Sequence, residues 1–121
     1  MFAVSYKVTR QYEAVSCEAP GHFDTRATRL HNPVDVNDGV IMMNLSHFLP
    51  GGGAEMAPAG FEMIYYVVEG EMTITLRDEA EQEQGVVLKA GDSVHFGKGT
   101  QRSCLNTGTA SAQMLVVMVK K

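Results

Sequence analysis

Short apolar runs separated by turn residues fill this chain from residue 40 onward, and they limit its possible folds more than any other feature. The runs are rich in Val, Ile, Tyr and Thr and are bounded by Gly, Pro, Asn or Asp, which is the pattern of β-strands. No window carries the sustained apolar period of an amphipathic helix. The predicted strands are Val40–Phe48, Phe61–Val68, Met72–Leu76, Gly85–Leu88, Ser93–Phe96 and Ala112–Val119.

The frequent turns indicate a sheet sandwich or a barrel. Breaks are expected at residues 49–53, 69–70, 90–92 and 106–108, where turn-forming residues gather. Met72–Leu76 alternates apolar and polar residues, so one face of this strand should be buried while the other is wet or faces a pocket. Met114–Val119 is apolar throughout and is expected to be buried on both faces.

The chain has 121 residues, which suits one domain. Residues 1–37 are less regular than the rest of the sequence. They are expected to form an N-terminal arm with one or two strands, such as Asp24–Leu30, ahead of a β-barrel domain at residues 38–121.

Charge, apolar run length and cysteine usage exclude several classes of protein. The formal net charge is -4, and the ten Lys and Arg residues are scattered without a basic stripe, so no nucleic-acid partner is expected. The longest apolar runs are far too short to span a bilayer, and the N-terminus lacks a secretory pattern. Cys17 and Cys104 are expected to be free thiols. We therefore expect a soluble cytoplasmic protein with no membrane partner.

Two glycine-framed segments follow each other in the second half of the chain. The first runs from Gly51 to Gly70 and closes on a Tyr-Val-Val-Glu-Gly turn, and the second starts at Gly91 and includes Gly99 and Asn106. In this order, with twenty residues between Gly70 and Gly91, they resemble the two motifs of the cupin family. The resemblance covers residues 40–119. It implies an all-β double-stranded β-helix, or jelly-roll barrel, with a pocket at one end and usually paired as a homodimer.

The residues that bind a metal ion in the family are replaced here. By this resemblance, Ala57, Ala59 and Met63 stand where the family keeps two histidines and a glutamate, and Arg102 stands in place of a third histidine. Alanine has no donor atom, methionine offers only a soft thioether, and an arginine would repel a divalent ion. No cofactor and no metal at the usual place are therefore expected. An unusual metal site built from His47, Glu55, Glu62 or His95 stays open.

Arg102 is predicted to bind a ligand, because a guanidinium can hold a carboxylate or phosphate with two parallel hydrogen bonds. Alternatively, Arg102 pairs with Glu55 or Glu62 and only holds the barrel mouth together; both can be true if a ligand displaces the carboxylate. The predicted ligand-binding residues are Arg102, Met63, Met56 and Cys104, in an apolar and adaptable cavity that suits a small organic acid.

The candidates for catalytic proton transfer are His47, Glu55, Glu62 and Tyr65. Alternation does not say which face of the His47 strand points inward. Glu62 should face away from the pocket unless a register shift swaps it with its neighbour, and Glu55 follows three glycines whose freedom would let it reach the pocket. Tyr65 shares a face with the pocket-facing position. A purely structural role remains an alternative for each.

These observations favour a metal-independent enzyme of the isomerase, lyase or hydrolase type that binds a small anionic organic ligand in the barrel. The alternatives are a non-catalytic ligand-binding or regulatory protein and a structural subunit of a larger enzyme, because this fold hosts many activities. A buried carboxylate and histidine within hydrogen-bonding distance would favour catalysis. A cavity filled by Met and Tyr side chains would favour the structural role.

Overall fold

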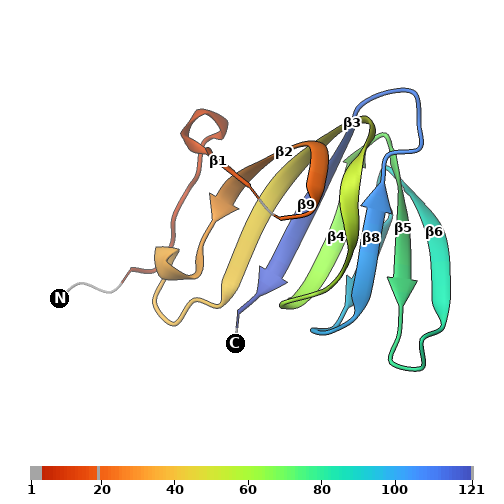
Figure 1. The fold of residues 1–121 in the computed structure, drawn as a ribbon. Helices are drawn as coiled ribbons and strands as arrows, with labels where there is room; N and C mark the ends of the chain where they lie inside the picture. The colour runs from red at the N-terminus through yellow and green to blue at the C-terminus, as the bar shows by residue number, and fades with distance from the viewer. Residues whose placement is uncertain (1–3, 19, 121) are drawn as a thin grey trace.

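The computed structural model describes residues 4–18 and 20–120, which fold into β-strands and two short 3-10 turns (Figure 1). The elements in chain order are η1 (Gln11–Glu13), β1 (Val15–Cys17), β2 (His22–His31), η2 (Pro33–Asp35), β3 (Ile41–Pro58), β4 (Glu62–Glu69), β5 (Glu71–Arg77), β6 (Glu83–Lys89), β7 (Ser93–Phe96), β8 (Gln101–Leu105) and β9 (Ala112–Val119). The predicted strands are therefore present, whereas β8, a polar strand, was not predicted. No helix among the described residues is long and apolar enough to cross a membrane.

Strand β3 belongs to both halves of the barrel. Its first half pairs with β9 on one side and β2 on the other, while its second half pairs with β8. The strands follow the order β6-β5-β8-β3-β9-β4-β7, and every pairing between them is antiparallel. The strands are joined in one continuous sheet whose two halves, on either side of β3, enclose a single core, which confirms the predicted all-β jelly-roll in a single domain.

The triple glycine was predicted to break the chain, and this prediction is wrong, because β3 continues through residues 51–53. A Cβ atom on Gly52 would lie 2.3 Å from the carbonyl oxygen of Asp24, and one on Gly53 would lie 2.0 Å from the carbonyl oxygen of Cys104. The glycines therefore serve as strand residues that let the neighbouring backbones of β2 and β8 approach closely. Only Gly51, with φ of 83°, has a turn-like backbone.

Strand β9 was expected to be buried on both faces, and within this single chain that is wrong. Met114, Val116 and Met118 point into the core and are buried. The alternate residues Leu115 and Val117 lie on the outer face, where they are only half-buried. Residues 114–119 are all apolar, so the sequence could not show that the side chains on one face of this strand remain partly exposed to solvent.

The N-terminal arm is joined to the barrel through β2. Strands β1 and β2 both lie within residues 1–37, and β2 pairs along β3 from Ala54 to Met43. The division at residue 37 stays a prediction. Both cysteines are free thiols, as predicted, with Cys17 half-buried on β1 and Cys104 buried on β8.

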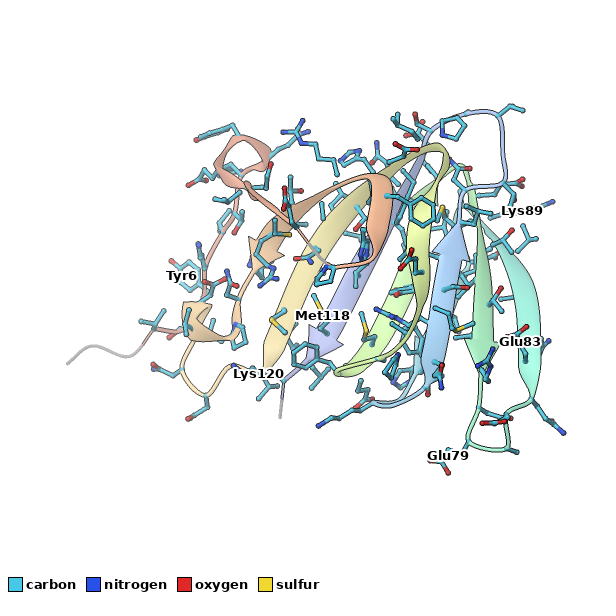
Figure 2. The ribbon with its side chains drawn as sticks, in the orientation of Figure 1. Tyr6, Glu79, Glu83, Lys89, Met118 and Lys120 are labelled. Carbon is cyan, nitrogen blue, oxygen red and sulfur yellow. The ribbon has the colours of Figure 1, made fainter. Side chains whose placement is uncertain are left out.

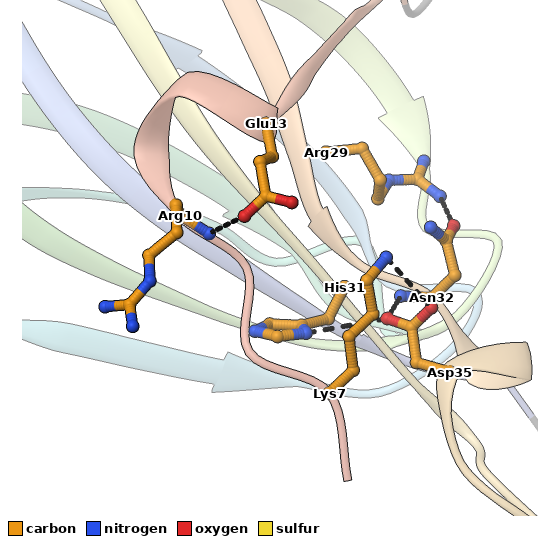
Figure 3. A network of polar contacts seen from close by, with 7 residues as sticks. All are labelled: Lys7, Arg10, Glu13, Arg29, His31, Asn32 and Asp35. Atoms are coloured by element: carbon orange, nitrogen blue, oxygen red, sulfur yellow. Dashed lines mark hydrogen bonds and ion pairs between the residues drawn. The ribbon is translucent and has the colours of Figure 1, made fainter. Parts of the chain in front are cut away.

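A polar network fixes the end of β2 (Figure 3). Asp35 accepts a hydrogen bond of 2.9 Å from the backbone amide of Asn32, and its carboxylate lies 3.6 Å from Lys7 Nζ and 3.5 Å from His31 Nδ1. The hydrogen bond from the Asn32 amide is the main cause that lowers the pKa of the Asp35 carboxyl, and the nearby Lys7 and His31 lower it further. In the same network, Arg29 donates a hydrogen bond of 2.8 Å to Asn32 Oδ1, so this end of β2 is held in place.

Candidate ligand site at the barrel mouth

The inner faces of the strands form rows of side chains that run across the barrel. In one sheet, Met42, Met118, Met63 and Phe96 are neighbours in register, and the next row inward contains Asn44, Val116 and Tyr65. In the facing sheet, Ala57, Arg102 and Leu76 form one row, and Ala54, Cys104 and Ile74 form the next.

Exposure shows which end of the barrel is open. Met72, Ile74 and Val67 at the closed end and centre are 0% exposed, whereas Arg102 and Leu76 are half-buried. The mouth is therefore at the end that carries Arg102. Met63 is 6% exposed there and forms part of its apolar floor.

Arg102 is held at the mouth by neutral oxygens. Its Nε donates a hydrogen bond of 3.2 Å to the phenol oxygen of Tyr65, and its Nη1 donates one of 3.0 Å to the carbonyl oxygen of Ala57. A guanidinium has five N–H groups, and the remaining ones make no hydrogen bond to any described residue. The charge is thus positioned without a carboxylate contact.

Tyr65 and Cys104 lie behind Arg102. The ring of Tyr65 packs edge-on against Phe96, with the ring centroids 4.9 Å apart, and burial raises the pKa of its phenol despite the opposing effect of Arg102. Burial also raises the pKa of the Cys104 thiol to about 11. At neutral pH both groups are therefore protonated, and Cys104 is not activated as a nucleophile.

The other candidate residues lie away from this inner face. His47 and Leu45 line a cavity on the outer side of β2 and β3. The side chain of His47 therefore points away from the barrel interior, which decides between the two directions that alternation had left open. Glu55 is exposed beside the turn at Gly21, and Met56 is half-buried near a register shift in β3. The structure therefore does not bring these residues together with Arg102.

Glu62 points outward, as alternation along β4 predicted. Its Oε2 lies 2.7 Å from Nε2 of His95, on the outer surface of β4 and β7. Met63, the next residue, fills the inner face instead. Among the buried residues in the described part of the chain there is no Asp, Glu or His, so the barrel interior contains no buried acid–base pair.

The residues at the mouth do not fit the metal ion of related barrels. Ala57 and Ala59 supply no donor atom, and the guanidinium of Arg102 occupies the mouth with a fixed positive charge. The described residues contain no group of three or more His, Cys, Asp or Glu side chains that could hold a metal ion.

A second arginine at the mouth was not selected from the sequence. Arg29 of β2 is paired with Asn44 of β3, and its Nε donates a hydrogen bond of 2.5 Å to Asn44 Oδ1. Its Nη1 lies 3.6 Å from the sulfur of the buried Met42. The sequence did offer a clue: Arg26 and Arg29 are three positions apart on one strand, so their side chains must lie on opposite faces of the sheet.

Comparison with known proteins agrees with this architecture. Residues 44–118 match the model of the cupin domain. The chain is 37% identical over 112 residues to the beta-D-galactosidase Rv1717 of Mycobacterium tuberculosis, and the match covers 93% of this chain and 92% of that protein.

Solved structures with low sequence identity share the fold. The polyketide cyclase RemF from Streptomyces resistomycificus superposes with a TM-score of 0.77 at 18% identity, over 95% of this chain and 80% of that one. A predicted oxalate decarboxylase from Thermotoga maritima gives a TM-score of 0.76 at 19% identity, over 95% of this chain and 100% of that one. At this identity the similarity concerns the fold alone.

Proposed function

The chain belongs to the cupin family, and from this premise we propose that it binds a small anionic organic compound at the barrel mouth through Arg102, without a metal ion. The observation that carries the proposal is the half-buried guanidinium, which is held by two neutral oxygens and has further N–H groups available. Met63 and Leu76 beside it provide apolar contact for the body of the ligand. We place this function in the cytoplasm, in keeping with the sequence-based expectation.

Whether the bound compound is also converted depends on groups at the mouth. The deeper barrel is filled by Met72, Met114 and Ile74, which leaves the rim as the place for chemistry. The phenol of Tyr65 is the titratable group in contact with Arg102, and its raised pKa makes it a hydrogen-bond donor rather than a base. The barrel interior alone therefore supports ligand binding better than proton abstraction.

Replacing Arg102 with alanine is expected to weaken binding of a carboxylate ligand by about 1.5–3 kcal/mol, because hydrogen bonds to a charged group contribute that much. Arg102→Lys should also weaken binding, since a point charge cannot form the paired hydrogen bonds. The measurement is isothermal titration calorimetry with the tightest ligand from a thermal-shift screen of organic acids.

The matched control is Lys98→Ala, which removes an exposed positive charge from the turn just before β8. It should leave affinity within about twofold, because an exposed charge is screened by solvent. Equal affinities for wild type and Arg102→Ala, with the fold intact, would show that Arg102 is not the ligand contact.

Hydrolysis of β-galactosides is a second candidate function, and the relative named as a beta-D-galactosidase favours it. Most glycosidases need two carboxyl groups about 5–10 Å apart at the scissile bond. Because no carboxylate is buried among the described residues, we infer that such groups would have to come from exposed positions such as Glu55 or Asp24.

The test is hydrolysis of 4-nitrophenyl β-galactoside by the purified chain and its Glu55→Gln, Glu62→Gln and Asp24→Asn variants. If this candidate is right, at least one variant should lose activity by about 100-fold or more, as expected for loss of a general acid or base. Wild-type protein without turnover would exclude the candidate for this substrate while leaving the binding proposal intact.

We also propose that the chain forms a homodimer through its arm and the outer face of β3, β9 and β4. Tyr6 on the arm is 80% exposed and lies on the side of the molecule remote from β5 and β6 (Figure 2). On the sheet, Tyr66 and Ile64 are 42% and 38% exposed and adjoin the half-buried Leu115 and Val117. Such an apolar surface favours a partner, and a second copy offers the same arm and face in return.

Sedimentation equilibrium at micromolar concentration should give twice the chain mass of 13.2 kDa. Tyr66→Glu should shift the protein toward the single chain, because it places a charge in the middle of the apolar face. Val87→Glu is the matched control, since Val87 is an apolar strand residue on β6, away from the proposed interface, and is 52% exposed against 42% for Tyr66. A wild-type species of one chain mass would contradict the proposal.

A further inference from the structure

A cavity lies outside the barrel, between the N-terminal arm and the outer face of β2 and β3. Its volume is about 1050 Å³, enough for a small organic molecule. Arg26, Thr28 and His47 line it from the sheet, and Thr9 and Tyr12 line it from the arm. It is separated from Arg102 by the sheet itself, because Arg102 faces the inner side.

Arg26 provides the positive charge of this cavity. Its side chain is exposed on the wall of the cavity and makes no hydrogen bond or ion pair with any residue that the structure describes. Its neighbour on β2, Arg29, by contrast, donates hydrogen bonds to Asn44 and Asn32. A guanidinium without a protein partner keeps its N–H donors available, so it can hold an anion in the cavity through paired, charge-assisted hydrogen bonds.

His47 stands directly beside Arg26, because the two residues are cross-strand partners on β3 and β2. Side chains paired in this way have Cβ atoms about 5 Å apart, so a single oxyanion can contact both. Asp24 also lines the cavity and is a carboxylate, so the anion must sit toward Arg26 and His47 rather than toward Asp24.

The hydroxyl of Thr9, on the arm side, gives independent support for a ligand in this cavity. Thr9 lines the cavity, and its hydroxyl oxygen is buried without a hydrogen-bond partner among the described residues. A buried hydroxyl without a hydrogen-bond partner is unfavourable. A small shift of the arm around a ligand would give this hydroxyl a partner.

Apolar surface accompanies these polar groups. Leu45 and Leu30 line the sheet side, and the ring of Tyr12 is 87% exposed on the arm side. A flat ring could pack between the leucines and Tyr12 while its charged group reaches Arg26. We propose that this cavity is a second binding site, separate from the barrel mouth, for a small ring-bearing organic anion held by Arg26 and His47.

The experiment is an NMR titration of the ¹⁵N-labelled full chain with phenyl phosphate, benzoate and, as the uncharged comparison, phenol. Phenyl phosphate or benzoate should shift the amide signals of Thr9, Arg26 and His47, and phenol should bind at least about tenfold more weakly because it lacks the charge. The phosphate and the carboxylate show which oxyanion the site prefers.

Arg26→Ala should weaken this binding by about tenfold or more, and Arg26→Lys by less. Arg102→Ala should leave these shifts in place, which separates this site from the proposed barrel-mouth site. Shifts confined to residues around Arg102, or affinity unchanged within about twofold in Arg26→Ala, would overturn the proposal. It is also overturned if neither anion binds and Arg26→Ala weakens only self-association, since the cavity would then be occupied by a second copy.

Discussion

Replacing Gly53 with alanine is expected to lower the free energy of unfolding by about 3 kcal/mol or more, or to prevent folding, because the new Cβ atom would overlap backbone. It would lie 2.0 Å from the carbonyl oxygen of Cys104 and 3.0 Å from the Cα of Leu105. Neither atom belongs to a flexible side chain, so β8 would have to move away from β3. That movement would break the pairing of Gly53 with Leu105 and of Ala54 with Cys104.

Gly60→Ala is the matched control. A Cβ atom on Gly60 meets nothing within 4 Å, and its φ angle is not positive. This variant should remain within about 0.5 kcal/mol of wild type or become slightly more stable, because alanine restricts the unfolded chain. Urea denaturation followed by circular dichroism gives both values. Equal losses for Gly53→Ala and Gly60→Ala would mean that the close approach of β8 to β3 is not what requires glycine.

The triple glycine at residues 51–53 is a part of the fold that the sequence did not predict correctly. Alternation and β-rich composition predicted the strands of the barrel well, since each of those runs carries its own burial pattern. Glycine has no side chain to bury, so its pattern fits a turn as well as a crowded strand. Which of the two applies depends on β2 and β8, whose approach from distant parts of the chain cannot be read locally.

The candidate site was predictable only in part, for a related reason. Period-two alternation correctly separated Glu62 from Met63, because the pocket-facing position in that strand was known from the resemblance. For His47 the same alternation left two choices, and the sheet partners of β3 decide between them. Arg29 is held by Asn32, three residues along the chain, and by Asn44 on β3, fifteen residues away. The first contact is local, but the second depends on how β2 pairs with β3 and could not be read from spacing.

Asn106 at the end of the second motif should be the most sensitive polar residue of the barrel. Its side chain is 1% exposed and makes hydrogen bonds with three backbone groups. Nδ2 donates to the carbonyl oxygens of Phe48, at 3.2 Å, and Ala110, at 2.9 Å. Oδ1 accepts from the amide of Gly108 at 3.0 Å. One side chain thus ties the loop between β8 and β9 to β3.

Asn106→Ala is expected to lower the free energy of unfolding by about 2–4 kcal/mol, because each buried backbone group left without a partner is unfavourable by about 1–3 kcal/mol. Asn106→Asp should be at least as damaging, since a carboxylate can accept from Gly108 but cannot donate to Phe48 or Ala110. The measurement is urea denaturation at neutral pH.

Thr73→Ala is the control for Asn106, because it removes a hydrogen bond of 3.0 Å to Thr107 in the same loop, but at an exposed position. Water can replace that bond, so the loss should stay near about 0.5 kcal/mol. If Asn106→Ala and Thr73→Ala destabilise the protein equally, the buried hydrogen bonds of Asn106 do not fix the loop. If Asn106→Asp is milder than Asn106→Ala, the bond from Gly108 outweighs the two donated bonds, and the anchoring of β3 must come from the backbone pair between Asn106 and Gly52, at 2.8 Å.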